Sequence, residues 1–84
     1  MNTRHRRTLS AVFTRPVSGS LKWRDVEALL NALGATISER AGSRVAVMVN
    51  DRVAVFHRPH PSPNMDRGAV RDLQRYLESA GITP

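Results

Sequence analysis

The chain has 84 residues, 40% hydrophobic and 24% charged, which is typical of one small globular domain and excludes a second domain or a disordered protein. No apolar run approaches the roughly 20 residues of a membrane span, and the Arg-rich start lacks a signal-peptide core, so we expect a cytoplasmic protein without membrane contact. Cysteine is absent, which excludes disulfides and thiolate metal sites. Gly-rich phosphate loops and metal-ligand sets are also absent, so we expect no cofactor.

The net charge of +6 lies entirely at the start of the chain. Residues 1–24 contain six basic and no acidic residues, whereas the basic and acidic residues after them cancel. Such a positive field favours encounter with nucleic acid or with an acidic protein. A solvated basic tail that keeps the protein in solution is the alternative.

Two segments with helical spacing of apolar residues open the chain. The first, residues 5–13, is short and precedes Pro16, and the second runs from Trp23 to Leu33. Gly34 is placed to end the second helix in a left-handed conformation. The apolar positions of the two segments are Leu9, Val12 and Phe13, then Trp23, Val26, Leu29, Leu30 and Leu33.

Residues 35–56 are rich in β-branched side chains and predict three short strands. Asn50 and Asp51 tolerate the positive φ values of a tight hairpin turn between the last two strands. The third strand is stopped by the proline-rich segment 59–63, which also favours an extended connection.

A final amphipathic helix is predicted from Asn64 or Asp66 to about Ala80, before Gly81. The predicted fold class is therefore α+β, with two helices on one face of a three-stranded antiparallel sheet and the other face open. The helix also carries a basic stripe, which is most simply a solvated face: Arg67, Arg71 and Arg75.

A two-residue loop at Asn50-Asp51 would place Arg44 opposite His57 in the hairpin. One face of the hairpin then suits a core, and the other is apolar but ends in polar groups. A three-residue loop would shift the register and separate Arg44 from His57. The face that suits a core carries Val45, Val47, Val49, Ala54 and Phe56. The other face carries Arg44, Ala46, Met48, Val53, Val55 and His57.

The chain from about residue 22 to 83 resembles the HicA toxins of bacterial toxin-antitoxin pairs. The resemblance rests on "WRDVEALLNALGA", "ERAGSRVAVMV", "VAVFHRPHPSP" and "RGAVRDLQRYLESAGI" in this order. It implies a double-stranded-RNA-binding-like α-β-β-β-α fold, cleavage of messenger RNA, and neutralisation by a HicB-like antitoxin. It divides the chain into a basic extension, residues 1–20, and a HicA-like domain, residues 21–84.

The sequence departs from the family just after Gly42-Ser43. The resemblance implies a catalytic histidine within two positions of this pair, where the chain has Arg44 and Val45. Metal-free RNA cleavage needs a proton acceptor and a proton donor near neutral pH, and a permanently charged guanidinium cannot be the acceptor.

Two interpretations of this departure remain open. In one, His57 and His60 perform the proton transfers while arginines hold phosphate. In the other, the domain is catalytically silent and only binds RNA or a HicB-like partner. The residues expected to bind RNA, mainly through its backbone, are Lys22, Arg44, Arg58, Arg4, Arg6 and Arg7.

The N-terminal extension has three open roles. It could extend the RNA-binding surface, pack its apolar residues over the sheet, or pack them against a second copy. A homodimer joined through the valine-rich face of the hairpin belongs to a third class, that of a structural interaction domain.

Overall fold

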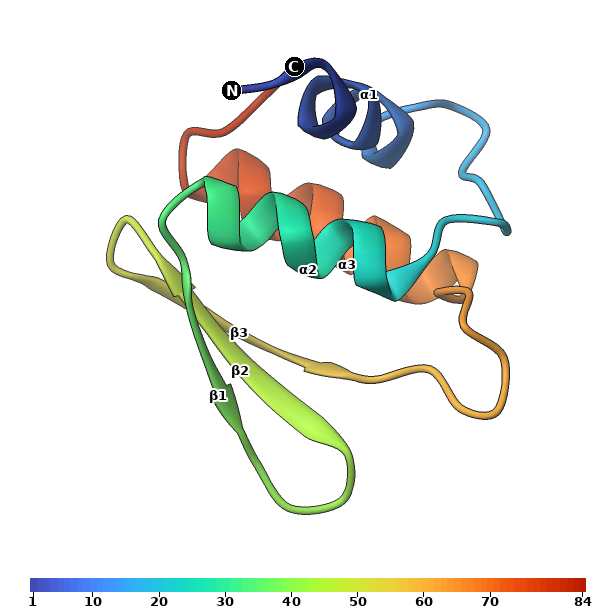
Figure 1. Cartoon of the computed structure of the whole chain (residues 1–84), viewed down its shortest axis with the longest axis vertical. Helices are drawn as coiled ribbons and strands as arrows, with labels where there is room; N and C mark the ends of the chain where they lie inside the picture. The colour runs from blue at the N-terminus through green and yellow to red at the C-terminus, as the bar shows by residue number, and fades with distance from the viewer.

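The computed structural model describes all residues from 1 to 84 and contains three helices and three strands (Figure 1). None of the helices is long and apolar enough to cross a membrane. In chain order the elements are α1 (Thr3–Val12), α2 (Trp23–Ala32), β1 (Thr36–Glu39), β2 (Arg44–Val49), β3 (Arg52–His57) and α3 (Arg67–Ser79).

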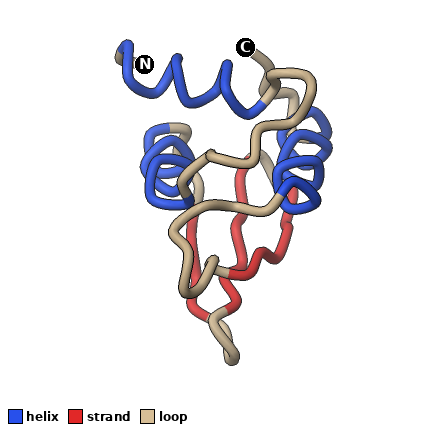
Figure 2. The backbone as a smooth tube through the Cα atoms, turned by 90° about the vertical axis from the view of Figure 1, so that its right-hand side faces the viewer, coloured by secondary structure: helices blue, strands red, loops and turns tan.

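The elements form three layers. The sheet is covered on one face by α2 and α3, and α1 lies on the other side of this helix pair, away from the sheet (Figures 1 and 2). The second face of the sheet is covered by no element. The α+β fold with an open three-stranded sheet is thus confirmed.

The strands are antiparallel in the order β1-β2-β3. Asn50 and Asp51 both have positive φ, 50° and 62°, so the hairpin closes with the expected two-residue turn. The side-chain amide of Asn50 also donates to the carbonyl of Ala80, at 2.8 Å, and fastens the turn to the end of α3. Every pairing of β2 with β3 follows from this turn.

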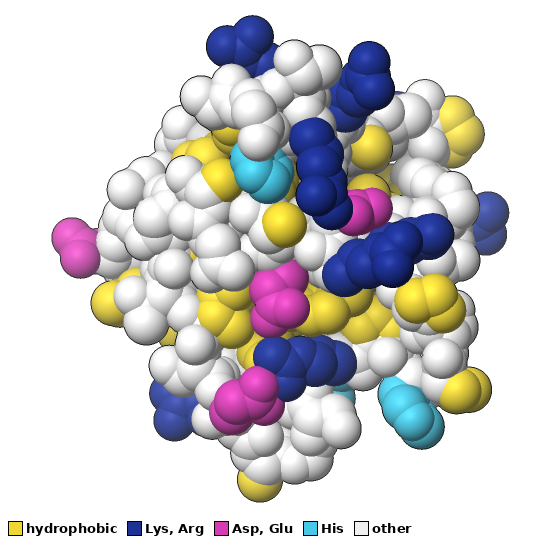
Figure 3. All heavy atoms as spheres, in the orientation of Figure 1, with side chains coloured by type: hydrophobic (Ala, Val, Ile, Leu, Met, Phe, Trp, Pro, Cys, Tyr) yellow, Lys and Arg dark blue, Asp and Glu magenta, His cyan; other side chains and the backbone are white.

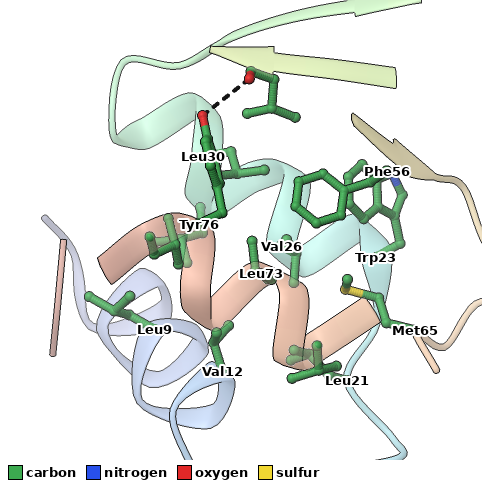
Figure 4. Packing of buried hydrophobic residues seen from close by; sticks show 14 of the residues in the cluster. Leu9, Val12, Leu21, Trp23, Val26, Leu30, Phe56, Met65, Leu73 and Tyr76 are labelled. Carbon is green, nitrogen blue, oxygen red and sulfur yellow. Dashed lines mark hydrogen bonds between the residues drawn. The ribbon is translucent and has the colours of Figure 1, made fainter. Parts of the chain in front are cut away.

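The core lies between the sheet and the helix pair and continues between the helix pair and α1, as Figure 4 shows. The ring of Phe56 lies between those of Trp23 and Tyr76, with centroids 6.1 and 6.0 Å away. The Tyr76 hydroxyl is within hydrogen-bonding distance of the carbonyls of Val47 (3.1 Å) and Arg52 (2.9 Å), and burial raises the pKa of Tyr76. The core residues of β2 are those expected from the period-two pattern: Val45, Val47 and Val49.

The N-terminal helix packs against helices, not against the sheet. Asn2 caps α1 by accepting from the backbone N–H of His5, so the helix begins earlier than the spacing of apolar residues predicted. Leu9 and Val12 are buried in the same core cluster as α2 and α3. The Gln74 side chain donates to the carbonyl of Val12, at 2.7 Å. Of the three open roles of the extension, packing over the sheet is therefore not the one found, because the apolar residues of α1 are buried against α2 and α3.

The caps fix the ends of the other two helices. Gly34 has a φ of 84° directly after the last turn of α2, where a left-handed residue is needed. Of the two expected caps of α3, Asp66 is the one used, and its carboxylate accepts from the backbone N–H of Ala69 at 2.7 Å. Gly81 follows the end of α3 with a φ of 77°.

Candidate nucleic-acid interface on the open face of the sheet

Arg44 of β2 and His57 of β3 are paired directly across the hairpin. The backbone N–H of Arg58 donates to the carbonyl of Ser43 at 2.9 Å, so the neighbouring Arg44–His57 pair is one without ladder hydrogen bonds. Side chains of such a pair stand close, with Cβ atoms roughly 4.5–5.5 Å apart. An arginine and a histidine side chain therefore start from adjacent positions on the open face.

Both side chains of this pair are exposed. The Nε of Arg44 donates to the carbonyl of Ala41 at 2.9 Å, which holds the guanidinium at the end of the sheet and leaves its two Nη groups without a protein partner. Neither residue forms an ion pair. The pair is therefore accessible to an anion, and Arg44 is oriented before the anion arrives.

A third basic residue, Arg40, extends this pair into a row. The backbone N–H of Arg40 donates to the carbonyl of Arg44 at 2.8 Å and continues the register of β1 on β2, so both side chains are on the open face. Arg40 also forms no ion pair. The sequence analysis missed Arg40, although period-two alternation through β1 combined with the β1–β2 register would have indicated it.

The rest of the open face is largely apolar. Beyond the basic row, the next row is Ser38, Ala46 and Val55, and the last is Thr36, Met48 and Val53. Met48, Val53 and Val55 are 46%, 63% and 54% exposed, the largest apolar exposures besides Met1. No acidic side chain occurs in these three rows. The face therefore combines apolar and cationic groups.

Arg58 is on the opposite side of the sheet from this face. Its guanidinium donates to Glu39 of β1 and, at 3.2 Å, to Glu27 of α2. The hydrogen bonds to Glu39 and then to Glu27 raise the pKa of Arg58 above its ordinary value. The structure therefore places Arg58 in an ion-pair bridge among three elements and does not bring it together with Arg44.

His60 lies in the loop after β3, is exposed, and makes no hydrogen bond. The end of this loop is fixed to the start of α2, because the backbone N–H of Trp23 donates to the carbonyl of Pro63 at 3.1 Å and Lys22 pairs with Asn64. Lys22 is thus placed beside the loop that carries His60. Of the two histidines, only His57 belongs to a cross-strand row of the sheet.

The N-terminal arginines lie in the helical layer farthest from the sheet. Arg4 pairs with Asp25 at 3.3 Å, whereas Arg6 and Arg7 are exposed on α1. In Figure 3, Lys and Arg side chains gather over the upper part of the molecule, and Asp and Glu side chains lie mainly below them. Because the helix pair separates α1 from the sheet, these arginines do not join the Arg44–His57 pair in one site.

Comparison with known proteins decides the family. The family model described as the HicA toxin of bacterial toxin-antitoxin systems matches residues 23–82. The chain belongs to the HicA toxin family. The match begins with α2 and ends just after α3, so it includes the whole open face and leaves α1 outside. No curated protein and no solved structure matches the chain.

In this HicA-family protein, the two residues after Gly42-Ser43 have opposite environments. Val45 is fully buried on the core side of β2, whereas Arg44 is exposed on the open side. Only position 44 could therefore present a catalytic side chain to a substrate. Of the two positions where the family resemblance implies a histidine, the exposed one thus holds an arginine, and it is paired with His57.

Proposed function

We propose that this HicA-family toxin binds RNA on the open face of its sheet and cleaves it without a metal ion, with His57 as the proton acceptor. The observation that supports this most directly is the Arg44–His57 pair, in which an arginine and a histidine are exposed at directly opposite positions of two strands. Imidazole is the side chain best suited to accept a proton near neutral pH.

The proposed reaction is an internal transesterification of the RNA backbone. His57 takes the proton from a ribose 2′-hydroxyl, and the 2′-oxygen forms a bond to the adjacent phosphorus. The bond between phosphorus and the 5′-oxygen of the next nucleotide breaks, which leaves a 2′,3′-cyclic phosphate and a 5′-hydroxyl. The leaving oxygen takes a proton from a second group, for which His60 is the candidate. Arg44 and Arg40 stabilise the charge on the phosphorane.

A catalytically silent RNA-binding module is the second candidate. It is favoured by the position of His60, which is in a loop and not in the basic row, so the face itself supplies one imidazole rather than two. In that case the basic row binds RNA, or the apolar rows bind a protein, and no bond is broken.

We also propose that an acidic HicB-like antitoxin neutralises the protein in the cytoplasm. Membership of a toxin-antitoxin family implies an antitoxin partner. The net charge of +6 and the open face, which has no acidic side chain, support an acidic partner. A homodimer through the same apolar rows is the alternative use of this face.

Cleavage and binding must be measured separately. We would incubate a labelled messenger RNA with the wild-type protein, His57→Ala and His60→Ala in the presence of EDTA, and measure RNA affinity of the same three proteins. The expected result is cleavage by wild type, loss of cleavage in His57→Ala, and similar affinity in all three. Binding by all three proteins with cleavage by none would contradict the proposed catalysis and support the silent module.

A further inference from the structure

A hollow of about 180 Å³ opens on the uncovered face of the sheet, beside the basic row. Its floor and one side are apolar and come from β2 and β3, whereas its other side carries hydroxyl groups of β1. Besides the backbone of β2, the lining residues are Thr36, Ser38, Arg40, Ala46, Met48 and Val53.

Arg40 is shared by the hollow and by the basic row. Ser38 and Ala46 form the next row along the strands, about 7 Å away from the Arg40–Arg44 row. Neither arginine is neutralised by a carboxylate. A phosphate held by Arg40 and Arg44 would therefore have its own sugar and base at the mouth of the hollow.

We propose that this hollow is a nucleoside subsite for single-stranded RNA, an inference that rests on the proposed RNA-binding function. Arg40 and Arg44 hold the phosphate. The hydroxyls of Ser38 and Thr36, two residues apart on the same face of β1, contact the sugar, including its 2′-hydroxyl, which distinguishes RNA from DNA.

The base lies against the apolar side of the hollow. Met48 is 46% exposed, and its thioether can contact the face or edge of a base. No aromatic side chain lines the hollow, so the base is held by one sulfur contact and by Val53 rather than by ring stacking. A single strand is required, because bases within a duplex are already stacked and paired.

A folded protein partner would use this face differently. It would cover the exposed apolar side chains as one surface, Val55 included, because Val55 is next to Ala46 and is 54% exposed. A nucleoside in the hollow contacts Val53 but not Val55, which is outside the hollow. Val53 and Val55 are on the same strand and the same face. Substituting each of them in turn therefore distinguishes a bound nucleoside from a bound protein.

The test is the affinity of a short labelled single-stranded oligoribonucleotide, its deoxy form, and an abasic form with the same backbone. The variants are Ser38→Ala, Met48→Ala and Val53→Ala, with Val55→Ala as the matched control and Arg44→Gln as the phosphate control. Circular dichroism establishes that each variant is folded.

We expect Ser38→Ala to weaken RNA binding about threefold and leave DNA binding unchanged. Met48→Ala should weaken binding of the base-bearing RNA about two- to tenfold and leave the abasic form unaffected. Val53→Ala should act like Met48→Ala, whereas Val55→Ala should bind every oligonucleotide like wild type.

The subsite would be overturned, and the RNA-binding function retained, if Arg44→Gln weakened binding while Ser38→Ala and Met48→Ala did not. Equal losses in Val53→Ala and Val55→Ala would also overturn it, in favour of one broad apolar contact. If the wild-type protein bound none of the oligonucleotides at moderate salt, that result would contradict both the subsite and the proposed RNA-binding function.

Discussion

Arg44 and His57 occupy directly opposite positions of β2 and β3, on the face of the sheet that no helix covers. The family resemblance implies a histidine at one of the two positions after Gly42-Ser43. Of these, only the position of Arg44 is exposed, because Val45 is fully buried. Arginine at this position supplies charge but no proton transfer. In the proposed site, Arg44 therefore binds phosphate, whereas proton transfer depends on His57.

Arg44→His should increase RNA cleavage in the presence of EDTA. The new imidazole would stand beside His57, and two adjacent imidazoles can act as acceptor and donor, where each positioned group contributes roughly 10²–10⁴-fold. We expect an increase of at least about tenfold, measured as the initial rate on a labelled RNA. Arg44→Gln is the control, which removes the charge without adding a titratable group. Equal rates for the two variants would contradict a catalytic role of this position.

Arg58→Gln should affect stability more than RNA binding. The change removes both ion pairs, to Glu27 and to Glu39, that link α2 to β1 and the end of β3. We expect a lower midpoint of thermal unfolding, with a difference from wild type that shrinks as salt screens the charges. If RNA affinity fell as much as in Arg44→Gln, the phosphate-binding role expected for Arg58 from the sequence would hold instead.

The two residues of the hairpin turn should respond differently to substitution. Asn50→Ala should lower the free energy of unfolding by about 2 kcal/mol, because it keeps an unfavourable positive φ and removes the bond to the Ala80 carbonyl. Asp51→Gly should leave stability unchanged or raise it, since glycine adopts positive φ freely. Urea unfolding measures both. Equal destabilisation by the two changes would mean that the hydrogen bond from Asn50 to the Ala80 carbonyl does not stabilise the turn.

Leu9→Ala should destabilise the whole domain and not only α1. Leu9 is 4% exposed and belongs to the same core cluster as α2 and α3. We expect a loss of about 2–4 kcal/mol in a single cooperative transition. Arg7→Ala, a change on the exposed side of the same helix, is the control and should alter stability little. A separate early transition in Leu9→Ala would show that α1 folds independently of the family domain.

Much of this fold could be predicted from local sequence patterns. The alternating valines of residues 45–49 predicted which face of β2 is buried, and the period of two made that prediction reliable once the turn was assigned. Asn50-Asp51 predicted the turn and with it the opposition of Arg44 and His57, because a two-residue loop leaves a single register. Gly34 predicted the end of α2, and the start of α3 was narrowed to Asn64 or Asp66, because helix caps are local interactions.

The position of α1 was decided by tertiary structure alone. Its apolar residues have the spacing of any amphipathic helix, which indicates that one side is buried but not against which surface. Likewise, Arg40, Arg44 and Arg58 are equally basic in the sequence, yet two stand on the open face and the third is held between Glu27 and Glu39. Long-range packing makes this distinction, because Glu27 and Glu39 approach Arg58 only when α2 and the sheet come together.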